Sequence, residues 1–151
     1  MKLSTNGLEL IKRFEGYRSK AYRDGANVWT CGYGHTAGVA ADTTCTQAVA
    51  EQWLRADVAT AEREVARLCA PQGTVILRQC QYDALVSIIF NIGTGAFRQS
   101  RLRRLILTDP DMAEIAAEWT KWCHITVGGR KQVSDGLLAR RRAEAAHYFG
   151  Q

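Results

Sequence analysis

Hydrophobic positions recur with a helical period along the first part of the chain. Three apolar residues lie three positions apart: Leu8, Ile11 and Phe14. This spacing places them on one face of a helix. Ser4 or Thr5 can cap the start of this helix, and Gly16 can end it. We therefore predict an N-terminal helix that ends directly after Glu15.

The helical period disappears between positions 17 and 34, and at its start Tyr17, Ser19 and Ala21 alternate with Arg18, Lys20 and Tyr22. Asp24-Gly25 is a turn dipeptide, and Val28–Thr30 reads as the strand that returns from it. Gly32 and Gly34 then indicate either a tight approach of the backbone or a third short strand. The segment predicts a small antiparallel sheet.

The remaining apolar pattern is helical. Thr44 or Thr46 caps a predicted helix of more than twenty residues, which Pro71-Gln72-Gly73 breaks. Its inner face is predicted to carry Val49, Trp53 or Leu54, Val58, Ala61, Val65 and Leu68. A helix of this length can connect two lobes.

Four further helices are predicted, with a glycine-rich elbow and one turn between them. The helices span Gln81–Phe90, Gln99 or Ser100 to Leu107, a segment starting at Asp109-Pro110, and Ser134 or Asp135 to Phe149; the elbow is Asn91–Ala96 and the turn is Val127–Gly129. A sheet near the N-terminus followed by helices is typical of the α+β class. With 151 residues, the chain is long enough for one domain with its own core.

The chain is basic, with a formal net charge of +5. Such a charge favours nucleic acid, an anionic membrane or an anionic polymer such as bacterial cell wall. Two arginine runs carry much of it: Arg98, Arg101, Arg103 and Arg104, then Arg140, Arg141 and Arg142. We interpret both runs as solvated helix faces, with attraction of an acidic polymer as the sharper alternative. No aromatic stacking platform accompanies them, which disfavours a nucleic-acid partner.

No apolar window is long enough to span a bilayer, and Met1–Gly16 has no apolar core or cleavage site of a signal peptide. We therefore expect a soluble protein made in the cytosol, without stable membrane insertion. The five cysteines form no pattern with metal-binding spacing. They are expected to be buried free thiols, with a single disulfide as the alternative.

Two carboxylates and a hydroxyl surround the predicted turn: Glu15, Asp24 and Thr30. A helix C-terminus disfavours an anion, so it favours the protonated carboxyl that a general acid needs at Glu15. A second carboxylate beside a hydroxyl can hold a water for attack on a sugar. An inverting glycosidase would need about 6.5–9.5 Å between the two carboxyl groups. Taken alone, these residues are also explained without catalysis, as a solvated Glu/Asp pair in which Asp24 is an ordinary turn residue.

The segment FEGYRSKAYRDGANVWTCGYGHT (Phe14–Thr36) resembles the phage-type lysozymes, the endolysins of glycoside hydrolase family 24. That family carries a Glu, eight residues, an Asp, five residues and a Thr, and both spacings are kept here. The resemblance continues in QYDALVSIIFNIGTGAF (Gln81–Phe97) and GLLARRRAE (Gly136–Glu144), so it spans nearly the whole chain. Cys31 departs from the family, which usually has an aliphatic residue there.

The resemblance implies one lysozyme-like catalytic domain over residues 1–151. Its small sheet lobe would span about 14–43, and a long helix would join it to a helical lobe of about 70–151 plus the N-terminal helix. The implied reaction is hydrolysis of the β-1,4 bond between N-acetylmuramic acid and N-acetylglucosamine in peptidoglycan. Glu15 would be the general acid, and Asp24 and Thr30 would position water or stabilise positive charge. The candidate substrate-binding residues are Tyr33, Asn91, Gly93 and Arg140.

The same resemblance implies no metal and no cofactor. We expect a monomer that waits in the host cytoplasm and reaches the periplasmic cell wall with the help of a holin, causing lysis. A muramidase serving as a secreted effector or a virion component shares this chemistry. A catalytically inactive wall-binding module and an enzyme acting on chitin or chitosan are further alternatives; the intact triad and the motif match, respectively, disfavour them.

Overall fold

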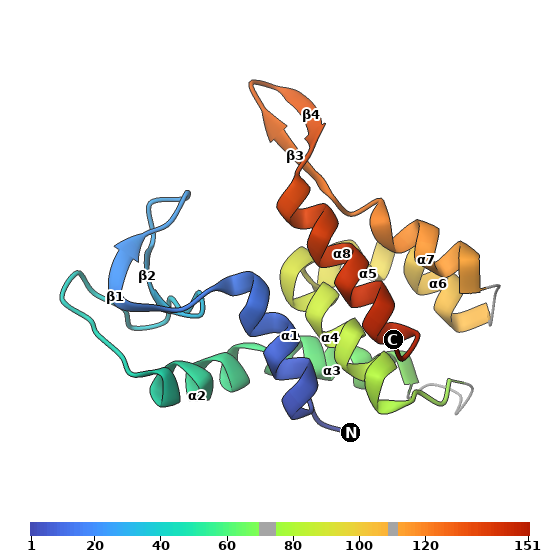
Figure 1. Cartoon of the computed structure of the whole chain (residues 1–151), viewed down its shortest axis with the longest axis horizontal. Coiled ribbons are helices and arrows are strands. Elements are labelled where there is room, and N and C mark those ends of the chain that lie inside the picture. Colours follow the sequence, from blue (N-terminus) through green and yellow to red (C-terminus); the bar gives the residue numbers. More distant parts are fainter. Residues whose placement is uncertain (70–74, 109–111) are drawn as a thin grey trace. The chain divides into compact units, whose positions relative to one another are not determined.

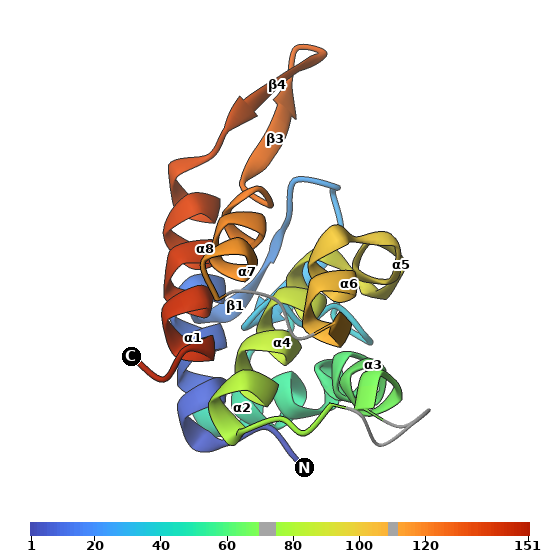
Figure 2. The ribbon, with the colours of Figure 1, turned by 90° about the vertical axis from the view of Figure 1, so that its right-hand side faces the viewer.

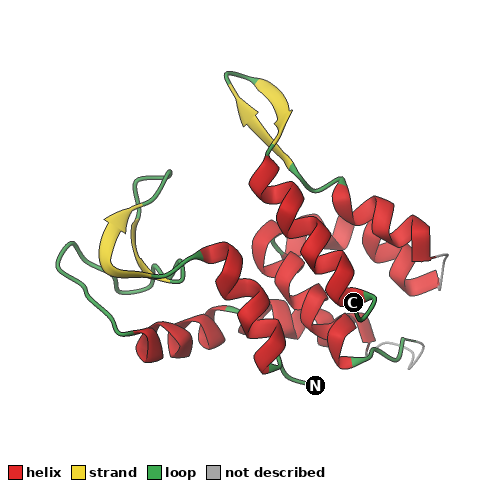
Figure 3. Ribbon diagram, in the orientation of Figure 1, coloured by secondary structure: helices red, strands yellow, loops and turns green. Residues whose placement is uncertain are grey.

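The computed structural model describes residues 1–69, 75–108 and 112–151 (Figure 1). The chain forms two compact units. The sheet unit is Leu8–Ala59, and the helical unit combines Met1–Gly7 with Thr60–Gln151. Helices dominate and two small antiparallel sheets accompany them, which confirms the α+β class (Figure 3). The predicted break at 71–73 and the helix start at 109–110 lie outside the described residues.

The N-terminal helix has the predicted bounds. Helix α1 spans Thr5–Glu15. The hydroxyl of Ser4 caps it by accepting a hydrogen bond from the backbone N–H of Gly7 at 3.1 Å. Gly16 follows with φ +70°, a left-handed conformation that ends a helix without strain in glycine. Glu15 is therefore the last helical residue, as the sequence predicts.

Strands β1 (Arg18–Arg23) and β2 (Trp29–Gly32) form the predicted antiparallel pair in the sheet unit. The prediction of a third short strand at positions 32–34 is wrong. Residues 43–45 instead contact the outer edge of β1, where Ala21 N donates to Thr43 O and Cys45 N donates to Ser19 O. The alternative of a tight approach is confirmed for Gly32. A Cβ atom there would lie 2.9 Å from the Cβ of Ala50.

The long helix predicted from position 46 to 68 is two consecutive helices, α2 (Gln47–Asp57) and α3 (Ala59–Cys69). Thr46, the second of the two predicted caps, accepts a hydrogen bond from Val49 N. The interruption falls at Val58, whose ψ of −9° departs from the helical value of about −42°. The apolar stripe nonetheless continues across it, because Leu54, Val58 and Ala61 are all buried.

Helix α4 (Gln79–Ile92) is the core of the helical unit. It is buried from Tyr82 to Ile89, and it packs most extensively against the C-terminal helix α8 (Asp135–Tyr148) (Figures 1 and 2). Three shorter helices complete the unit: α5 (Thr94–Gln99), α6 (Arg101–Thr108) and α7 (Met112–Thr120). Ser100 precedes α6 and Ser134 caps α8. Each is one of the two alternative starting residues that the sequence predicted for its helix.

The glycine-rich elbow is narrower than predicted. Asn91 still belongs to α4, and Thr94 already begins α5, so Gly93 alone breaks the helix with φ +88°. A single residue suffices because glycine reaches this backbone conformation without a Cβ clash.

A second hairpin lies in the helical unit, where the sequence predicted only a turn. Strands β3 (His124–Val127) and β4 (Arg130–Val133) pair around Gly128 and Gly129, both with positive φ. Two glycines with positive φ provide the twist that a two-residue hairpin requires. The hairpin extends away from the helices of its own unit, and every residue of its strands is exposed (Figure 2).

The cysteines whose side chains the structure describes are free thiols: Cys31, Cys45, Cys80 and Cys123. The sulfur atoms of Cys31 and Cys45 lie 3.4 Å apart, well beyond the roughly 2.05 Å of a disulfide. Burial, followed by the hydrogen bond with Cys31, raises the pKa of the Cys45 thiol to about 11. Within the described ranges, no helix is long and apolar enough to cross a membrane.

Candidate active site

The turn between β1 and β2 holds the carboxylate of Asp24. The backbone N–H groups of Ala26 and Val28 both donate to Asp24 Oδ1 at 2.9 Å. The backbone of Asp24 closes the same turn, since its N–H donates to Val28 O and its carbonyl accepts from Asn27 N. Both side-chain bonds fall on Oδ1, so Oδ2 is the oxygen placed to accept from a water.

Thr30 joins this arrangement through the carbonyl of Val28. Its Oγ1 donates to Val28 O at 3.0 Å, and the same oxygen accepts from Asp24 N at 3.0 Å. The hydroxyl proton is thereby assigned, which leaves the Thr30 oxygen as an acceptor for a water proton. Thr30 is only 3% exposed, so its orientation is firmly set. The structure thus brings together two of the three predicted catalytic residues.

Glu15 is partly exposed at the end of α1, in the same sheet unit. A Cβ atom on Gly34 would lie 3.6 Å from Glu15 Oε2, so the backbone at Gly34 faces the carboxyl group. Gly34 has φ +86°, which a larger residue would adopt only with strain. Any other residue here would place its Cβ in van der Waals contact with the Glu15 carboxyl group.

A polar and aromatic cluster supports the turn that carries Gly34. Tyr33 is 4% exposed, and its ring packs 5.5 Å from that of Tyr17. Lys12 Nζ lies 5.5 Å from the centre of the Tyr33 ring and donates to Glu51 and Glu9. The hydrogen bond to Glu51 and, as the second cause, the hydrogen bond to Glu9 raise the pKa of Lys12 above its usual range. Tyr33, a predicted substrate-binding residue, is thus packed among the side chains that support this turn.

His35 secures the other end of the same turn. Its backbone exchanges two hydrogen bonds with Cys31, each 2.9 Å long. Its Nδ1 lies 2.8 Å from Asp57 Oδ2, and its ring stacks on Trp53 at 4.7 Å. These contacts give His35 a structural role in the turn.

The other three predicted substrate-binding residues belong to the helical unit. Asn91 and Gly93 are exposed at the end of α4. Arg140 is 4% exposed, and its Nε donates to Glu144 Oε1 at 3.0 Å. Arg141 is fully buried, so the interpretation of this arginine run as a solvated face is wrong for two of its three members. Of the earlier run, Arg98, Arg101 and Arg104 are exposed, as predicted.

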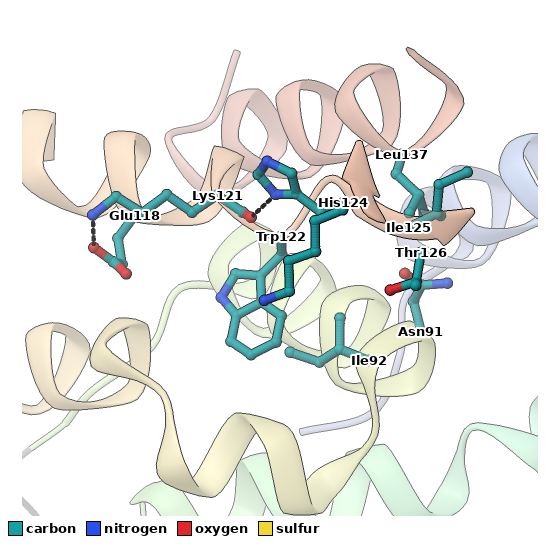
Figure 4. A pocket seen from close by; sticks show the side chains of 10 residues that line it. Asn91, Ile92, Glu118, Lys121, Trp122, His124, Ile125, Thr126 and Leu137 are labelled. Atoms are coloured by element: carbon teal, nitrogen blue, oxygen red, sulfur yellow. Dashed lines mark hydrogen bonds and ion pairs between the residues drawn. The ribbon is translucent and has the colours of Figure 1, made fainter. Parts of the chain in front are cut away.

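A cavity of about 560 Å³ lies in the helical unit between the ends of α4 and α7, the β3–β4 hairpin and the start of α8 (Figure 4). Asn91 and Ile92 form one wall, and Trp122 lies among cationic and apolar side chains of the hairpin side. Trp122 is half-buried, and no pattern in the sequence predicted this cavity. Two glycines between short alternating segments were the available signal for the hairpin that closes it.

The chemistry of the sheet unit suits hydrolysis. Glu15 can donate a proton, and Asp24 with Thr30 can bind a water through acceptor oxygens that no backbone group occupies. Across the described residues, no group of three His, Cys, Asp or Glu side chains is placed to hold a metal ion.

Comparisons with known proteins agree with this arrangement. The family model described as phage lysozyme matches residues 12–144. The endolysin of Acyrthosiphon pisum secondary endosymbiont phage 1 is 44% identical over 146 residues, with 97% of each chain covered. The endolysin of Salmonella phage P22 is 39% identical over 156 residues, with 99% of each covered. The solved muramidase domain of SpmX from Asticaccaulis excentricus superimposes with a TM-score of 0.89 at 35% identity, covering 97% of both chains.

Proposed function

The chain belongs to the phage lysozyme family, and from this premise we propose that Glu15, Asp24 and Thr30 cleave the glycan strands of peptidoglycan. The enzyme is a lysozyme of the endolysin type, which degrades the bacterial cell wall. The bond we propose is the β-1,4 link between N-acetylmuramic acid and N-acetylglucosamine. The observation that carries the proposal is the Asp24–Val28–Thr30 arrangement, which lies in the same compact unit as Glu15 at the end of α1.

Glu15 is the proposed general acid. It protonates the glycosidic oxygen as the bond to the anomeric carbon breaks. The open backbone at Gly34 supports this role, because a side chain there would contact the carboxyl group.

Asp24 and Thr30 are proposed to act on the water. Asp24 Oδ2 and the Thr30 oxygen each accept a hydrogen bond from this water, which turns a lone pair toward the sugar carbon. As the water oxygen bonds to that carbon, the proton that the water loses passes to Asp24. Two backbone N–H groups fix the Asp24 carboxylate through Oδ1, and its negative charge also balances the positive charge that develops on the sugar.

Both compact units are proposed to form a single catalytic domain. Asn91 and Gly93 would contribute substrate contacts from the end of α4, where Asn91 lines the cavity beside Trp122. Arg140 would contribute a cation from α8. Tyr33 would act by supporting the turn beneath Glu15, since little of its surface is exposed.

The decisive experiment compares the wild type with Glu15→Gln in a turbidity assay on permeabilised Gram-negative cells. The fragments released are analysed for new reducing ends. Clearing by the wild type alone, with new N-acetylmuramic acid ends, supports the proposal. Asp42→Asn is a matched control, because Asp42 is an exposed carboxylate of the same unit. Equal clearing by the wild type and Glu15→Gln removes Glu15 from its role.

Release to the wall is a separate part of the proposal. We expect action as a monomer that leaves the host cytoplasm with a holin and then reaches the periplasmic wall. Expression in a Gram-negative host with and without a co-expressed holin tests this expectation. Rapid lysis without the holin contradicts it, and light scattering of the purified enzyme reports the oligomeric state.

A further inference from the structure

The carboxylate of Glu144 lies at the centre of a buried polar network in the helical unit, and no surface of this residue is exposed. Ser87 Oγ of α4 donates to its Oε1 at 2.7 Å, and Trp119 Nε1 of α7 donates to its Oε2 at 3.1 Å. On α8, Arg140 Nε and Arg141 Nε each lie 3.0 Å from one of its oxygens. One side chain therefore connects three helices and faces two guanidinium groups.

The network continues from Arg141 to the surface. Arg141 Nη2 donates to Glu144 Oε1 at 3.1 Å and to Asn91 Oδ1 at 2.9 Å. A guanidinium group only donates, so the Asn91 atom that faces it must be the oxygen. The amide nitrogen of Asn91 then remains as the donor that a ligand can meet. Asn91 lines the same cavity as Trp122 and Thr126 (Figure 4).

A carboxylate at this position has a consequence that an apolar residue would lack. Two arginines buried beside each other repel, and each needs acceptors in a fixed place. Glu144 offers both oxygens and a negative charge, and so sets the direction of both guanidinium planes. Asn91 is the helical unit's proposed polar side-chain contact to the wall and the buried Arg140 is its proposed cation. Each is one or two hydrogen bonds away from Glu144.

We propose that Glu144 is a positioning residue for the lysozyme reaction: it orients Arg140 directly, and through Arg141 it holds Asn91 with its amide N–H turned to the substrate. The inference rests on the proposed function for its substrate, a glycan strand whose hydroxyl, acetamido and carboxyl oxygens accept hydrogen bonds. Glu144 itself touches no substrate.

The first test separates binding from chemistry in Glu144→Gln. On soluble uncross-linked peptidoglycan strands, we expect KM to rise about 3- to 10-fold while kcat changes less than about twofold, the pattern of a lost binding contact. Glu64→Gln is the matched control, since Glu64 is also buried in the helical unit and paired with an arginine, Arg98. It should lower the melting temperature and leave KM unchanged. An equal rise of KM in both variants overturns the proposal.

A double-mutant cycle then tests the route through Asn91. If Glu144 acts through this amide, Asn91→Ala and Glu144→Gln together should raise KM by less than the product of their separate factors. Glu64→Gln combined with Asn91→Ala should give the simple product. A simple product in the first pair contradicts the positioning route.

A measurement made without substrate distinguishes a failure of the positioning role from a failure of the proposed function. The Asn91 side-chain amide resonances should shift in Glu144→Gln and stay in place in Glu64→Gln. Arg141→Lys serves if Glu144→Gln does not fold, because it keeps a positive charge near Glu144 but loses the fork that reaches Asn91. Unmoved resonances refute the positioning role, whatever the enzyme hydrolyses. Moved resonances in a protein that leaves glycan strands intact refute the proposed function alone.

Discussion

Two carboxylates in different units of the molecule are held in opposite ways. Asp24 in the sheet unit is partly exposed, and the backbone of its own turn supplies both hydrogen bonds to one of its oxygens. Glu144 in the helical unit is fully buried, and side chains from three helices reach both of its oxygens. Asp24 therefore keeps an oxygen available to water, whereas Glu144 keeps none.

The comparison shows how one type of group serves two purposes. A carboxylate fixed by a local turn needs little from the rest of the fold, so it can remain reactive at a surface. A buried carboxylate needs several donors at once, so it orders the groups around it and loses its own reactivity. Substitutions at the two positions should accordingly differ in whether they affect activity or stability.

Asp24→Asn should show the largest effect, and on activity alone. The Asn oxygen can still accept from Ala26 N and Val28 N, so the turn should keep its shape. The negative charge is lost, and we expect kcat to fall by about 10²–10⁴-fold, the usual contribution of such a group. The initial rate of wall clearing measures it, and circular dichroism should show a melting temperature close to that of the wild type. A large fall in that temperature would make Asp24 a structural residue.

Glu144→Ala should reverse this pattern. Two buried arginines would lose the carboxylate that they share, and breaking a buried ion pair typically costs about 3–5 kcal/mol in the free energy of unfolding. The urea midpoint measures this loss. Ser87→Ala is the comparison, since it removes one neutral donor to the same carboxylate and should cost only about 1 kcal/mol. Similar costs in the two variants would mean that Glu144 does not organise its network.

The Glu64–Arg98 pair should be intermediate and dependent on pH. The two hydrogen bonds from Arg98 lower the pKa of Glu64 in the folded protein. Because the folded pKa lies below the unfolded value of about 4.3, the pair stabilises the fold at neutral pH. That stabilisation is lost as the pH falls below the unfolded pKa and through the lower folded pKa. Glu64→Gln should cost about 1–3 kcal/mol at pH 7 and nearly nothing at low pH, as urea unfolding against pH can show.

The smallest predicted effect concerns the chemical reactivity of the Cys45 thiol. Its pKa of about 11 leaves few thiolates at pH 8, so alkylation by iodoacetamide should be about 100-fold slower than for an ordinary thiol. Mass spectrometry of digests taken over time measures the rate for this residue. Unfolding the chain in urea should restore an ordinary rate. Fast alkylation in the native protein would contradict the raised pKa of this thiol.

Several features could be predicted because their causes are local. Ser4, Thr46 and Ser134 cap helices with their own hydroxyl groups, and Asp24-Gly25 bends the chain within a few residues. The candidate triad came from a resemblance whose motif also lies within one short segment. The interruption at Val58 and the start of α5 at Thr94 were missed, because neither has a capping residue or a proline to mark it.

The sequence by itself determined the α+β class, most helix starts and the family, since short-range hydrogen bonds and the apolar period are written in neighbouring residues. Only the tertiary structure decided which charges are buried. Arg140 and Arg141 were interpreted as part of a solvated helix face, yet both are buried together with Glu144. Helices α4 and α7 supply Ser87 and Trp119 as donors to that carboxylate. The physical reason is that desolvation depends on what packs from distant parts of the chain, and no local pattern records it.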